Sequence, residues 1–376
     1  YIETASHLTE VYDLQMPLNL FLKEFFKSNR KFGSRDRKLI AELVYGFYRL
    51  GKQADGFDKR IALVCGAFLS GRLPLKFFEK AADYLVQAFD KTVEEKWGFL
   101  QQFASFTHEI PFDFGNDFNT QLYRQYLCTN PKVFIRIRQH KELILRSLAK
   151  GQIPFERISD HCLAFEQSVQ LQDVLTDADY VIQDYASQMT GELFHPQKGE
   201  KWWDCCCASG GKSILLLDKK VPISLTVSDI RANILQSFHP RMMRYNYQSA
   251  YTSHVLDATL DITQLKTSYF DKIICDVPCS GSGTWRRTPE QFYFFTPEKL
   301  EEFHHRQVKI LSNVLSFLKQ DGELYYITCS VFRRENEDVL AEVAKEFDIE
   351  IASQQYCNAM ELGGDQLFLA VVKKKG

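Results

Sequence analysis

The sequence predicts an α/β protein that begins with an all-helical region and continues through a small mixed α+β region into a larger domain. Three observations predict this class. Apolar residues repeat at helical spacing up to about residue 120, without the alternation of strands. Apolar and other residues alternate over 133–137. From about residue 181, apolar runs typical of strands alternate with helical patterns, which is typical of a doubly wound parallel sheet. We therefore expect domains at 1–120, 121–180 and 181–376.

Composition excludes several classes of protein. The chain of 376 residues is 45% hydrophobic, enough for a large core, so extensive disorder is not expected. No apolar run approaches the length of a membrane span. A net charge of −2 argues against a protein that wraps nucleic acid over its whole surface. The ten cysteines form no CxxC pair, so we expect free thiols and no metal site.

The N-terminal residues do not indicate secretion. Acidic residues interrupt the first apolar stretch, so it does not resemble a signal peptide. Free thiols without a signal peptide favour a cytoplasmic protein, and we expect a monomer. The chain starts at Tyr1 rather than Met, so a short N-terminal piece is expected to be missing.

The first 120 residues contain four candidate helices. The clearest spans 35–50, where Leu39, Leu43 and Phe47 share one face, with Ser34 as the expected N-cap. Further helices are expected near 58–70, 76–89 and 92–106. This pattern predicts a helical N-terminal domain.

A local excess of positive charge marks the mixed region. The strand 133–137 and a helix over 140–150 carry most of it, and Lys132, Arg136 and Arg138 are the candidate contacts to nucleic-acid phosphates. A solvated helix face explains the same charges equally well.

The last domain has strands and helices in alternation. The expected strands are 202–207, 223–227, 251–256, 272–275 and 323–328, with two late strands near 348–352 and 367–373. The expected helices are 212–219, 231–245, 297–318 and 335–346. Ligands bind beyond the carboxyl ends of the strands in such sheets, so the residues that follow each strand are informative.

Acids and thiols follow five successive strands. They are the segment Cys206–Lys212, then Asp229, Asp257, the segment Asp276–Gly281, and Cys329 with Ser330. Any one of the aspartates alone is explained by a helix N-cap. The set together predicts a ligand site.

The ligand implied by these residues is S-adenosylmethionine. The turn is neither GxGxxG nor a P-loop, so a dinucleotide or triphosphate is disfavoured. Asp229 lies 18 residues past Gly211, a spacing at which an acid binds ribose hydroxyls. The adenine would meet Asp257, and the cationic amino-acid end would meet the turn and Asp276. The expected cofactor residues of the turn are Cys206, Cys207, Ala208, Ser209, Gly210, Gly211 and Lys212.

Two thiols need a separate explanation. Cys279 and Cys329 end the fourth and fifth expected strands, which are commonly neighbours, and each precedes a serine. A lone cysteine at a strand end is more often packed than reactive. Thiolate addition to C6 of a pyrimidine, however, makes C5 nucleophilic enough to accept a methyl group, and a second group must then assist release.

These residues resemble the RNA cytosine-5 methyltransferases of the Sun and nucleolar-protein type. The resemblance covers at least 131–376. It rests on Asp204-x-Cys206-x-Ala208-x-Gly210-Gly211-Lys212, Asp229-Ile230-Arg231, Asp276-Val277-Pro278-Cys279-Ser280-Gly281-Ser282-Gly283, Thr328-Cys329-Ser330 with Glu335-Asn336-Glu337, and Gln183-Asp184-x-Ala186-Ser187-Gln188. Ser209 departs from the family pattern, which has proline there, so a looser turn is expected.

The resemblance implies a class I, Rossmann-like methyltransferase domain and roles for the two thiols. It implies that Cys329 attacks C6, that Cys279 assists product release and that Asp276 holds the cytosine. DNA cytosine methyltransferases use the Pro-Cys thiol as nucleophile instead, so Cys329 favours the RNA type. The Arg35-Asp36-Arg37 and Leu43-Val44-Tyr45-Gly46 segments resemble family members with a NusB-like RNA-binding domain, which points to ribosomal small-subunit RNA.

Further RNA contacts and rival functions follow from the same residues. Arg286 and Arg287 are candidate phosphate contacts, although a solvated pair is equally compatible. Trp285, Phe292 and Tyr293 are candidates for base stacking, with core packing as the alternative. The rival functions are a catalytically silent RNA-binding assembly factor and a methyltransferase acting on transfer RNA, DNA or protein.

Overall fold

The structure is a computed structural model that describes residues 1–103, 110–116, 118–166 and 169–375. The chain divides into two compact units. The helical unit comprises Tyr1–Phe112, Asn119–Asn130 and Thr284–Thr296, and the sheet unit comprises Asp113–Phe118, Pro131–Gly283 and Pro297–Gly376. The expected domains are continuous in sequence, whereas the helical unit includes a distant segment, because the chain leaves the sheet unit after Gly283 and returns at Pro297.

The helical unit contains only helices among its described residues. They are α1 (Ile2–Val11), α2 (Leu18–Ser28), α3 (Ser34–Arg49), α4 (Lys59–Ser70), α5 (Leu75–Ala81), α6 (Val93–Phe103), α7 (Thr120–Cys128) and α12 (Pro289–Phe294), with 3-10 helices η1 (Gly51–Gly56) and η2 (Asp83–Ala88). The expected helix 76–89 is two elements, because Ala82 has φ and ψ angles of −165° and 78°, which lie outside the helical region. The expected end at 104–106 lies outside the described residues.

Local side chains explain where these helices begin. The Asp58 carboxylate accepts the N–H groups of Arg60 and Ile61, which starts α4. The N-cap of α3 is Gly33 rather than Ser34, because the Gly33 N–H donates to the Asp36 carboxylate over 3.0 Å. The acid at the third helical position therefore fixes the start of α3.

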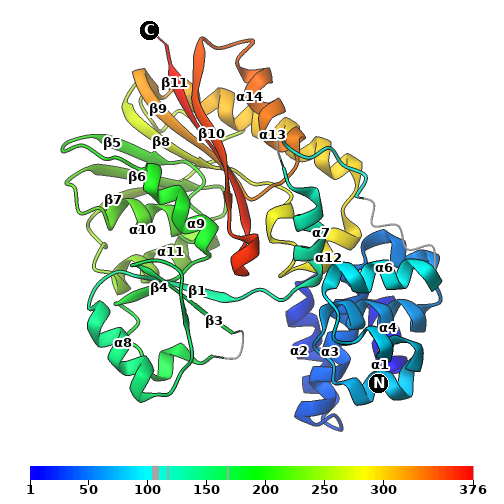
Figure 1. The fold of residues 1–376 in the computed structure, drawn as a ribbon. Helices are drawn as coiled ribbons and strands as arrows, with labels where there is room; N and C mark the ends of the chain where they lie inside the picture. Colours follow the sequence, from blue (N-terminus) through cyan, green and yellow to red (C-terminus); the bar gives the residue numbers. More distant parts are fainter. Residues whose placement is uncertain (104–109, 117, 167–168, 376) are drawn as a thin grey trace. The chain divides into compact units, whose positions relative to one another are not determined.

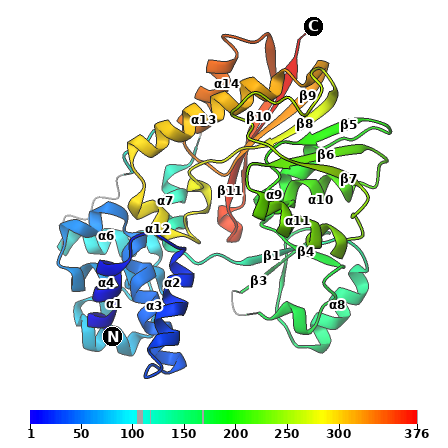
Figure 2. The ribbon, with the colours of Figure 1, turned by 180° about the vertical axis from the view of Figure 1, so that it is seen from behind.

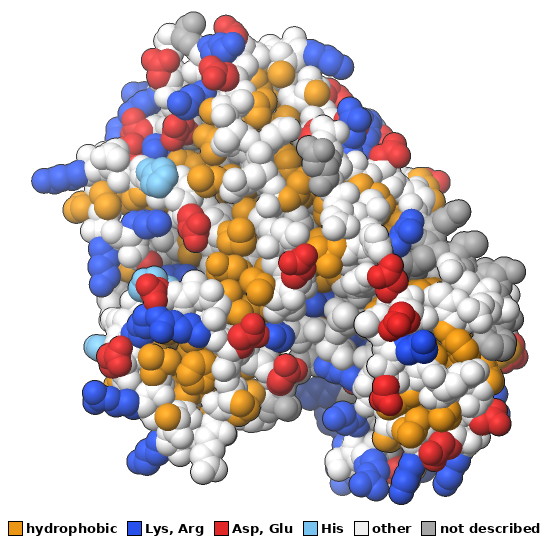
Figure 3. Space-filling model, viewed as in Figure 1, with side chains coloured by type: hydrophobic (Ala, Val, Ile, Leu, Met, Phe, Trp, Pro, Cys, Tyr) orange, Lys and Arg blue, Asp and Glu red, His pale blue; other side chains and the backbone are white. Residues whose placement is uncertain are grey.

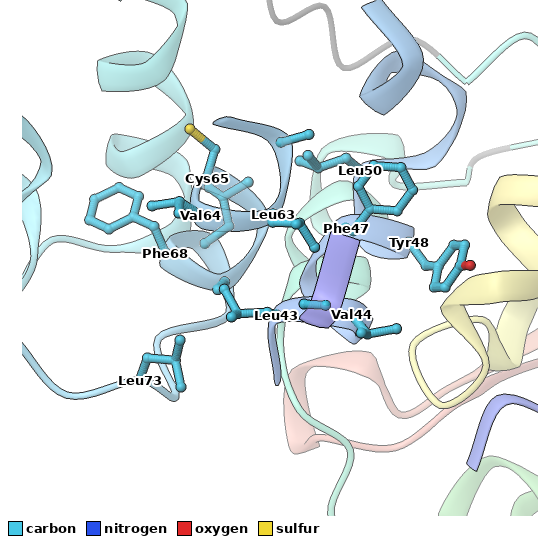
Figure 4. Packing of buried hydrophobic residues seen from close by; sticks show 14 of the residues in the cluster. Leu43, Val44, Phe47, Tyr48, Leu50, Leu63, Val64, Cys65, Phe68 and Leu73 are labelled. Carbon is cyan, nitrogen blue, oxygen red and sulfur yellow. The ribbon is translucent and has the colours of Figure 1, made fainter. Parts of the chain in front are cut away.

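Helices α3 and α4 pack around two glycines. A Cβ on Gly66 would lie 2.1 Å from the carbonyl oxygen of Gly46, and one on Gly46 would lie 2.5 Å from the backbone nitrogen of Ala67. The two backbones therefore approach more closely than any side chain allows. Figure 4 shows the apolar side chains of this core, with Leu43 and Phe47 of α3 and Leu63 of α4.

Segment 284–296 is built into the helical unit. Trp285 is fully buried, and the rings of Tyr293 and Phe47 lie 5.5 Å apart between centroids. A Cβ on Gly51 would lie 2.5 Å from the ring of Phe292. In this structure these aromatic side chains pack inside the protein, which agrees with core packing, the alternative to base stacking.

The sheet unit begins with a small antiparallel sheet. Its strands are β1 (Val133–Ile137), β2 (Glu156–Arg157), β3 (Cys162–Phe165) and β4 (Tyr180–Ile182), in the order β2-β3-β1-β4, with α8 (Lys141–Lys150) after β1. The expected strand and helix are confirmed here.

A sheet of seven strands follows, in the order β10-β11-β9-β8-β5-β6-β7. The strands are β5 (Lys201–Asp204), β6 (Ser224–Asp229), β7 (Tyr251–Val255), β8 (Phe270–Asp276), β9 (Leu318–Thr328), β10 (Ile349–Asn358) and β11 (Gln366–Lys374). The first five run parallel, but β11 is antiparallel to both β9 and β10. The parallel sheet expected from the sequence therefore ends in antiparallel pairings of β11 at this edge.

Helices cover both faces of this sheet (Figures 1 and 2). They are α9 (Tyr185–Thr190), α10 (Gly211–Leu217), α11 (Ala232–Arg244), α13 (Pro297–Leu315) and α14 (Glu337–Val343). The chain also contains short 3-10 helices at 171–173, 191–193, 282–284, 333–335 and 360–362. Trp202 and Trp203 are fully buried in separate cores on opposite faces. Their ring N–H groups donate to Glu200 and Ser228, so neither indole buries an unsatisfied donor.

The surface is mixed in charge. Figure 3 shows acidic and basic side chains interspersed over one face, as the net charge of −2 implies. None of the helices in the described part of the chain has the length and apolar character that a membrane span requires.

Candidate active site at the carboxyl ends of the strands

A cavity of about 740 Å³ lies at the carboxyl ends of the central parallel strands. Strand order reverses beside β5, whose two neighbours are β6 and β8, and ligands bind at this point in open α/β sheets. The lining includes Cys206, Ala208, Asp229, Asp257, Asp276, Cys279 and Cys329 from the expected site. The residues that follow β5, β6, β7, β8 and β9 therefore meet in one cavity.

The turn after β5 is shaped by backbone conformation. Ala208 and Gly210 both have positive φ angles, of 44° and 86°. A Cβ on Gly210 would lie 2.7 Å from the ring of Phe238, so only glycine fits there. The remaining expected cofactor residues of this turn, Cys207, Ser209, Gly210, Gly211 and Lys212, are not part of the cavity lining.

Asp229 supports the turn and borders the cavity. Its carboxylate accepts the Ala208 N–H over 3.1 Å and the Arg231 N–H over 3.0 Å. The Arg231 guanidinium also pairs with it at 3.0 Å. This carboxylate therefore fixes the turn while it lines the cavity.

Ser209, which stands where the family has proline, is hydrogen-bonded by a side chain from outside the turn. Arg241 of α11 donates to the Ser209 carbonyl over 2.9 Å and to its hydroxyl over 2.7 Å. The looser turn expected from the sequence is therefore offset by a side chain that the motif does not contain.

Acidic side chains lie close together beside the cavity. Burial, opposed by the hydroxyl of Ser213, raises the pKa of Asp204 to about 7, and the neighbouring Asp276 and Asp229 carboxylates add to this rise. Lys212 pairs with Asp276 at 2.9 Å; burial lowers the pKa of Lys212, but the Asp276 carboxylate outweighs it, so the net shift is upward. The second carboxylate oxygen of Asp204 is buried without a hydrogen-bond partner.

These residues fit a ligand that carries positive charge and hydroxyl groups. Asp229, Asp257 and Asp276 line the cavity, and S-adenosylmethionine has ribose hydroxyls, an ammonium group and a sulfonium. The arrangement can therefore hold this cofactor with carboxylate acceptors.

The two thiols meet in the same cavity. The Cys279 and Cys329 sulfur atoms lie 3.2 Å apart, and the Cys329 N–H donates to the Cys279 sulfur over 3.3 Å. The other eight cysteines are buried except for Cys206. The hydrogen bond with Cys329, followed by burial, holds the pKa of Cys279 well above the usual range of a thiol.

The predicted RNA contacts behave differently from one another. Arg136 and Arg138 both pair with Asp218, at 2.6 and 2.8 Å, and are nearly buried. Arg286 is 1% exposed and packs over the Tyr126 ring at 4.4 Å. Its guanidinium is buried in this structure, and the phosphate contact expected for Arg286 stays a prediction. Arg287 is exposed, and Lys132 pairs with Glu156.

Sequence reasoning missed part of the cavity lining. Arg306 and Ile310 line it from α13, and Thr259 lines it beside Asp257, whose carboxylate accepts the Thr259 N–H over 2.8 Å. The spacing of Arg306 and Ile310, one helical turn apart, is the signal that could have identified this face of the helix.

Comparison with known proteins gives the family. Residues 192–368 match the family model of the 16S rRNA methyltransferase RsmB/F. Residues 192–368 are thus a methyltransferase domain of the RsmB/F family. The RsmB/F domain includes every strand from β5 to β9, and its family supports S-adenosylmethionine as the cofactor. The resemblance stated from the sequence is thereby confirmed.

Relatives of known name cover part of the chain. Ribosomal RNA small subunit methyltransferase B of Shewanella oneidensis is 30% identical over 209 residues, which are 55% of this chain and 48% of that protein. The Proteus mirabilis protein of the same name is 29% identical over 52% of this chain and 46% of its own length. The chain therefore spans about half the length of the curated relatives it matches.

Solved structures share the fold at low identity. A structure named PH0851 is 16% identical, with a TM-score of 0.68 over 98% of this chain and 97% of that chain. NSun6 from Pyrococcus horikoshii with SFG is 15% identical, with a TM-score of 0.56 over 68% of this chain and 93% of that chain. They confirm the Rossmann-like fold expected from the sequence.

Proposed function

We propose that this chain transfers a methyl group from S-adenosylmethionine to C5 of a cytosine in RNA, with ribosomal small-subunit RNA as the substrate. The observation that carries the proposal is the 3.2 Å separation of the Cys279 and Cys329 sulfurs in a cavity lined by three carboxylates. The names of the RsmB/F relatives support a small-subunit ribosomal substrate.

The cofactor would be held by the residues that follow the first three central strands. Asp229 would accept ribose hydroxyls, Asp257 the adenine, and Asp276 with the turn would face the cationic end. When bound, the cofactor supplies an electrophilic methyl group on a sulfonium leaving group.

The thiols would divide the covalent work. Cys329 gives its proton to solvent and its sulfur bonds to C6 of the cytosine, which makes C5 nucleophilic toward the methyl group. Water then takes the C5 proton, the C5–C6 double bond re-forms and the C6–S bond breaks, and Cys279 assists the release of the Cys329 sulfur. The raised pKa of Cys279 supports this division, because a protonated Cys279 can donate its S–H to the Cys329 sulfur and is itself a poor nucleophile.

The target base must leave its stack to reach these sulfurs, so a single-stranded or flipped cytosine is required. Asp276 would hold its ring edge, beside the Lys212 ammonium group. The exposed Arg287 and the partly buried Lys132 remain candidate phosphate contacts, and the helical region 1–120 remains a candidate RNA-binding domain.

Adduct trapping tests the two thiols. With RNA and S-adenosylmethionine, Cys279→Ala is expected to accumulate a covalent protein–RNA adduct, visible as a band of reduced mobility in a denaturing gel. Cys329→Ala is expected to form none and to lose methyl transfer by several orders of magnitude. The double variant is the matched control, because it must abolish the Cys279→Ala adduct. An adduct in Cys329→Ala would reverse the roles.

The RNA target is tested separately. Bisulfite sequencing of cellular RNA before and after deletion of the gene is expected to show one cytosine of small-subunit ribosomal RNA that loses its methyl group. Loss of a methylated cytosine in transfer RNA instead would identify transfer RNA as the substrate. Unchanged methylation of all RNA would favour the silent assembly factor or a DNA or protein acceptor.

A further inference from the structure

Beneath the two thiols lies a buried carboxylate for which the proposed reaction has no role. Glu335 is fully buried at the end of the short 3-10 helix after β9. One carboxylate oxygen accepts the Ser280 N–H over 2.7 Å and the Gln307 side-chain amide over 3.0 Å. The other accepts the hydroxyls of Ser280, over 2.5 Å, and Ser330.

This carboxylate joins the two cysteine loops directly. Ser280 follows Cys279 in the chain, and Ser330 follows Cys329. Glu335 therefore bonds the next residue after each thiol, and both loops are fixed against one group. The two sulfurs belong to loops that are 50 residues apart in sequence, so nothing local sets their separation.

Neighbouring side chains also connect the two cysteine loops by hydrogen bonds. The Ser282 hydroxyl lies 3.1 Å from both the Ser280 and the Ser330 hydroxyls. The Gln307 amide also donates to the Pro278 carbonyl over 3.0 Å, one residue before Cys279. Four donors to Glu335 in a buried site make a network whose geometry has little freedom.

Burying an acid is not an effective way to stabilise the folded state. Burial raises the pKa of Glu335 even though its serine and glutamine partners oppose the rise. Replacing a buried ionisable group by an apolar one is often neutral for folding, so a specific geometry is the better explanation for this group.

We propose that Glu335 is a positioning residue that holds the Cys279 and Cys329 loops together and thereby sets the distance between the two sulfurs. Its effect on methyl transfer rests on the proposed function, whereas its effect on the thiol pair does not. An error of about 1 Å in the placement of reacting groups can cost about 10²-fold in rate.

The test compares Glu335→Gln with Glu337→Gln. An amide has a single acceptor oxygen, so Glu335→Gln can keep the partners of only one carboxylate oxygen. Glu337 is the matched control: it lies two residues further on, is partly buried and accepts the Asn116 N–H over 3.0 Å, without a hydrogen bond to either cysteine loop. We expect kcat to fall about 10²-fold in Glu335→Gln, with KM for S-adenosylmethionine nearly unchanged, and neither to change in Glu337→Gln.

A second readout does not depend on catalysis. Phenylarsine oxide bridges two adjacent thiols with loss of water, and the binding that disappears in Cys329→Ala measures this pair. We expect Glu335→Gln to weaken that binding about tenfold, because the loops no longer present the sulfurs together. Reduced arsenical binding in a chain that methylates no RNA would support the positioning role and reject the proposed function alone.

Two outcomes would overturn the inference. One is a folded Glu335→Gln protein whose arsenical binding matches that of Glu337→Gln, whatever its rate. The other is a loss of kcat with unchanged arsenical binding. If Glu335→Gln fails to fold, by circular dichroism, Ser330→Ala replaces it, since it removes one hydroxyl link and leaves the carboxylate; unchanged binding in that variant overturns the inference equally.

Discussion

Ala208 has a φ angle of 44°, which is uncommon for a residue with a side chain, and Asp229 and Arg241 hold the turn around it. The turn thus depends on two side chains from outside it. Asp229 comes from the adjoining strand and Arg241 from α11. Contacts with residues distant in the sequence therefore stabilise the unusual backbone conformation of Ala208.

The contact between Arg241 and Ser209 leads to a prediction at the scale of one residue. Arg241→Ala is expected to raise the dissociation constant for S-adenosylmethionine about fivefold, because two hydrogen bonds that fix the turn are lost at a solvent-exposed site. Isothermal titration calorimetry measures this constant. Arg244→Ala is the control, since Arg244 lies in the same helix and pairs with Asp177 instead. Equal affinity in both variants would show that the turn does not need Arg241.

Individual site residues were predictable to different degrees. Asp229, Asp257, Asp276, Cys279 and Cys329 follow strands, and the sheet brings strand ends together, so their meeting in one cavity was foreseeable. The burial of Arg286 was not, because Tyr126 and Thr129 lie more than 150 residues earlier in the chain. Pairwise partners of this kind leave no local signal in one sequence.

At the scale of elements, the contact between α3 and α4 gives a stability prediction. Gly66→Ala is expected to destabilise the protein by roughly 1–3 kcal/mol, because its Cβ would lie 2.1 Å from the Gly46 carbonyl oxygen and the helices must separate. Urea unfolding followed by circular dichroism measures the change.

Gly98→Ala is the control for that variant. Gly98 is an exposed helical glycine in α6, and nothing lies within 4 Å of the Cβ that it would gain. It should stabilise the protein by about 0.5–1 kcal/mol through helix propensity. A Gly66→Ala protein as stable as the Gly98→Ala protein would contradict the close packing.

Strand existence was easier to predict than strand direction. Apolar runs near 348–352 and 367–373 indicated the last two strands, which are β10 and β11. Their antiparallel pairing depends on the path of the chain between them, a short connection without a crossover helix. The prediction of one helix over 76–89 was wrong because the helix breaks at Ala82, where the sequence has no proline or glycine to indicate a break.

At the scale of the whole molecule, the division into two units predicts how fragments behave. A fragment 131–376 keeps segment 284–296 but loses the helices against which Tyr293 and Phe294 pack. We expect it to bind the dye ANS and to form oligomers in size-exclusion chromatography, because these apolar side chains become exposed.

A second fragment provides the control. Replacing 284–296 by a Gly/Ser linker of equal length removes the apolar side chains while the sheet unit keeps its own core. This fragment is expected to be monodisperse. Oligomers in both fragments would mean that the exposed surface lies elsewhere in the sheet unit.

The excursion of the chain between Gly283 and Pro297 also bears on how such a protein can evolve. A gene fusion that adds or removes a block of leading sequence would transfer only part of the helical unit and leave thirteen residues behind, as the bounds Thr284–Thr296 dictate. The two units are therefore inherited together, because replacing the helical unit would require one crossover after the leading block and one on each side of 284–296.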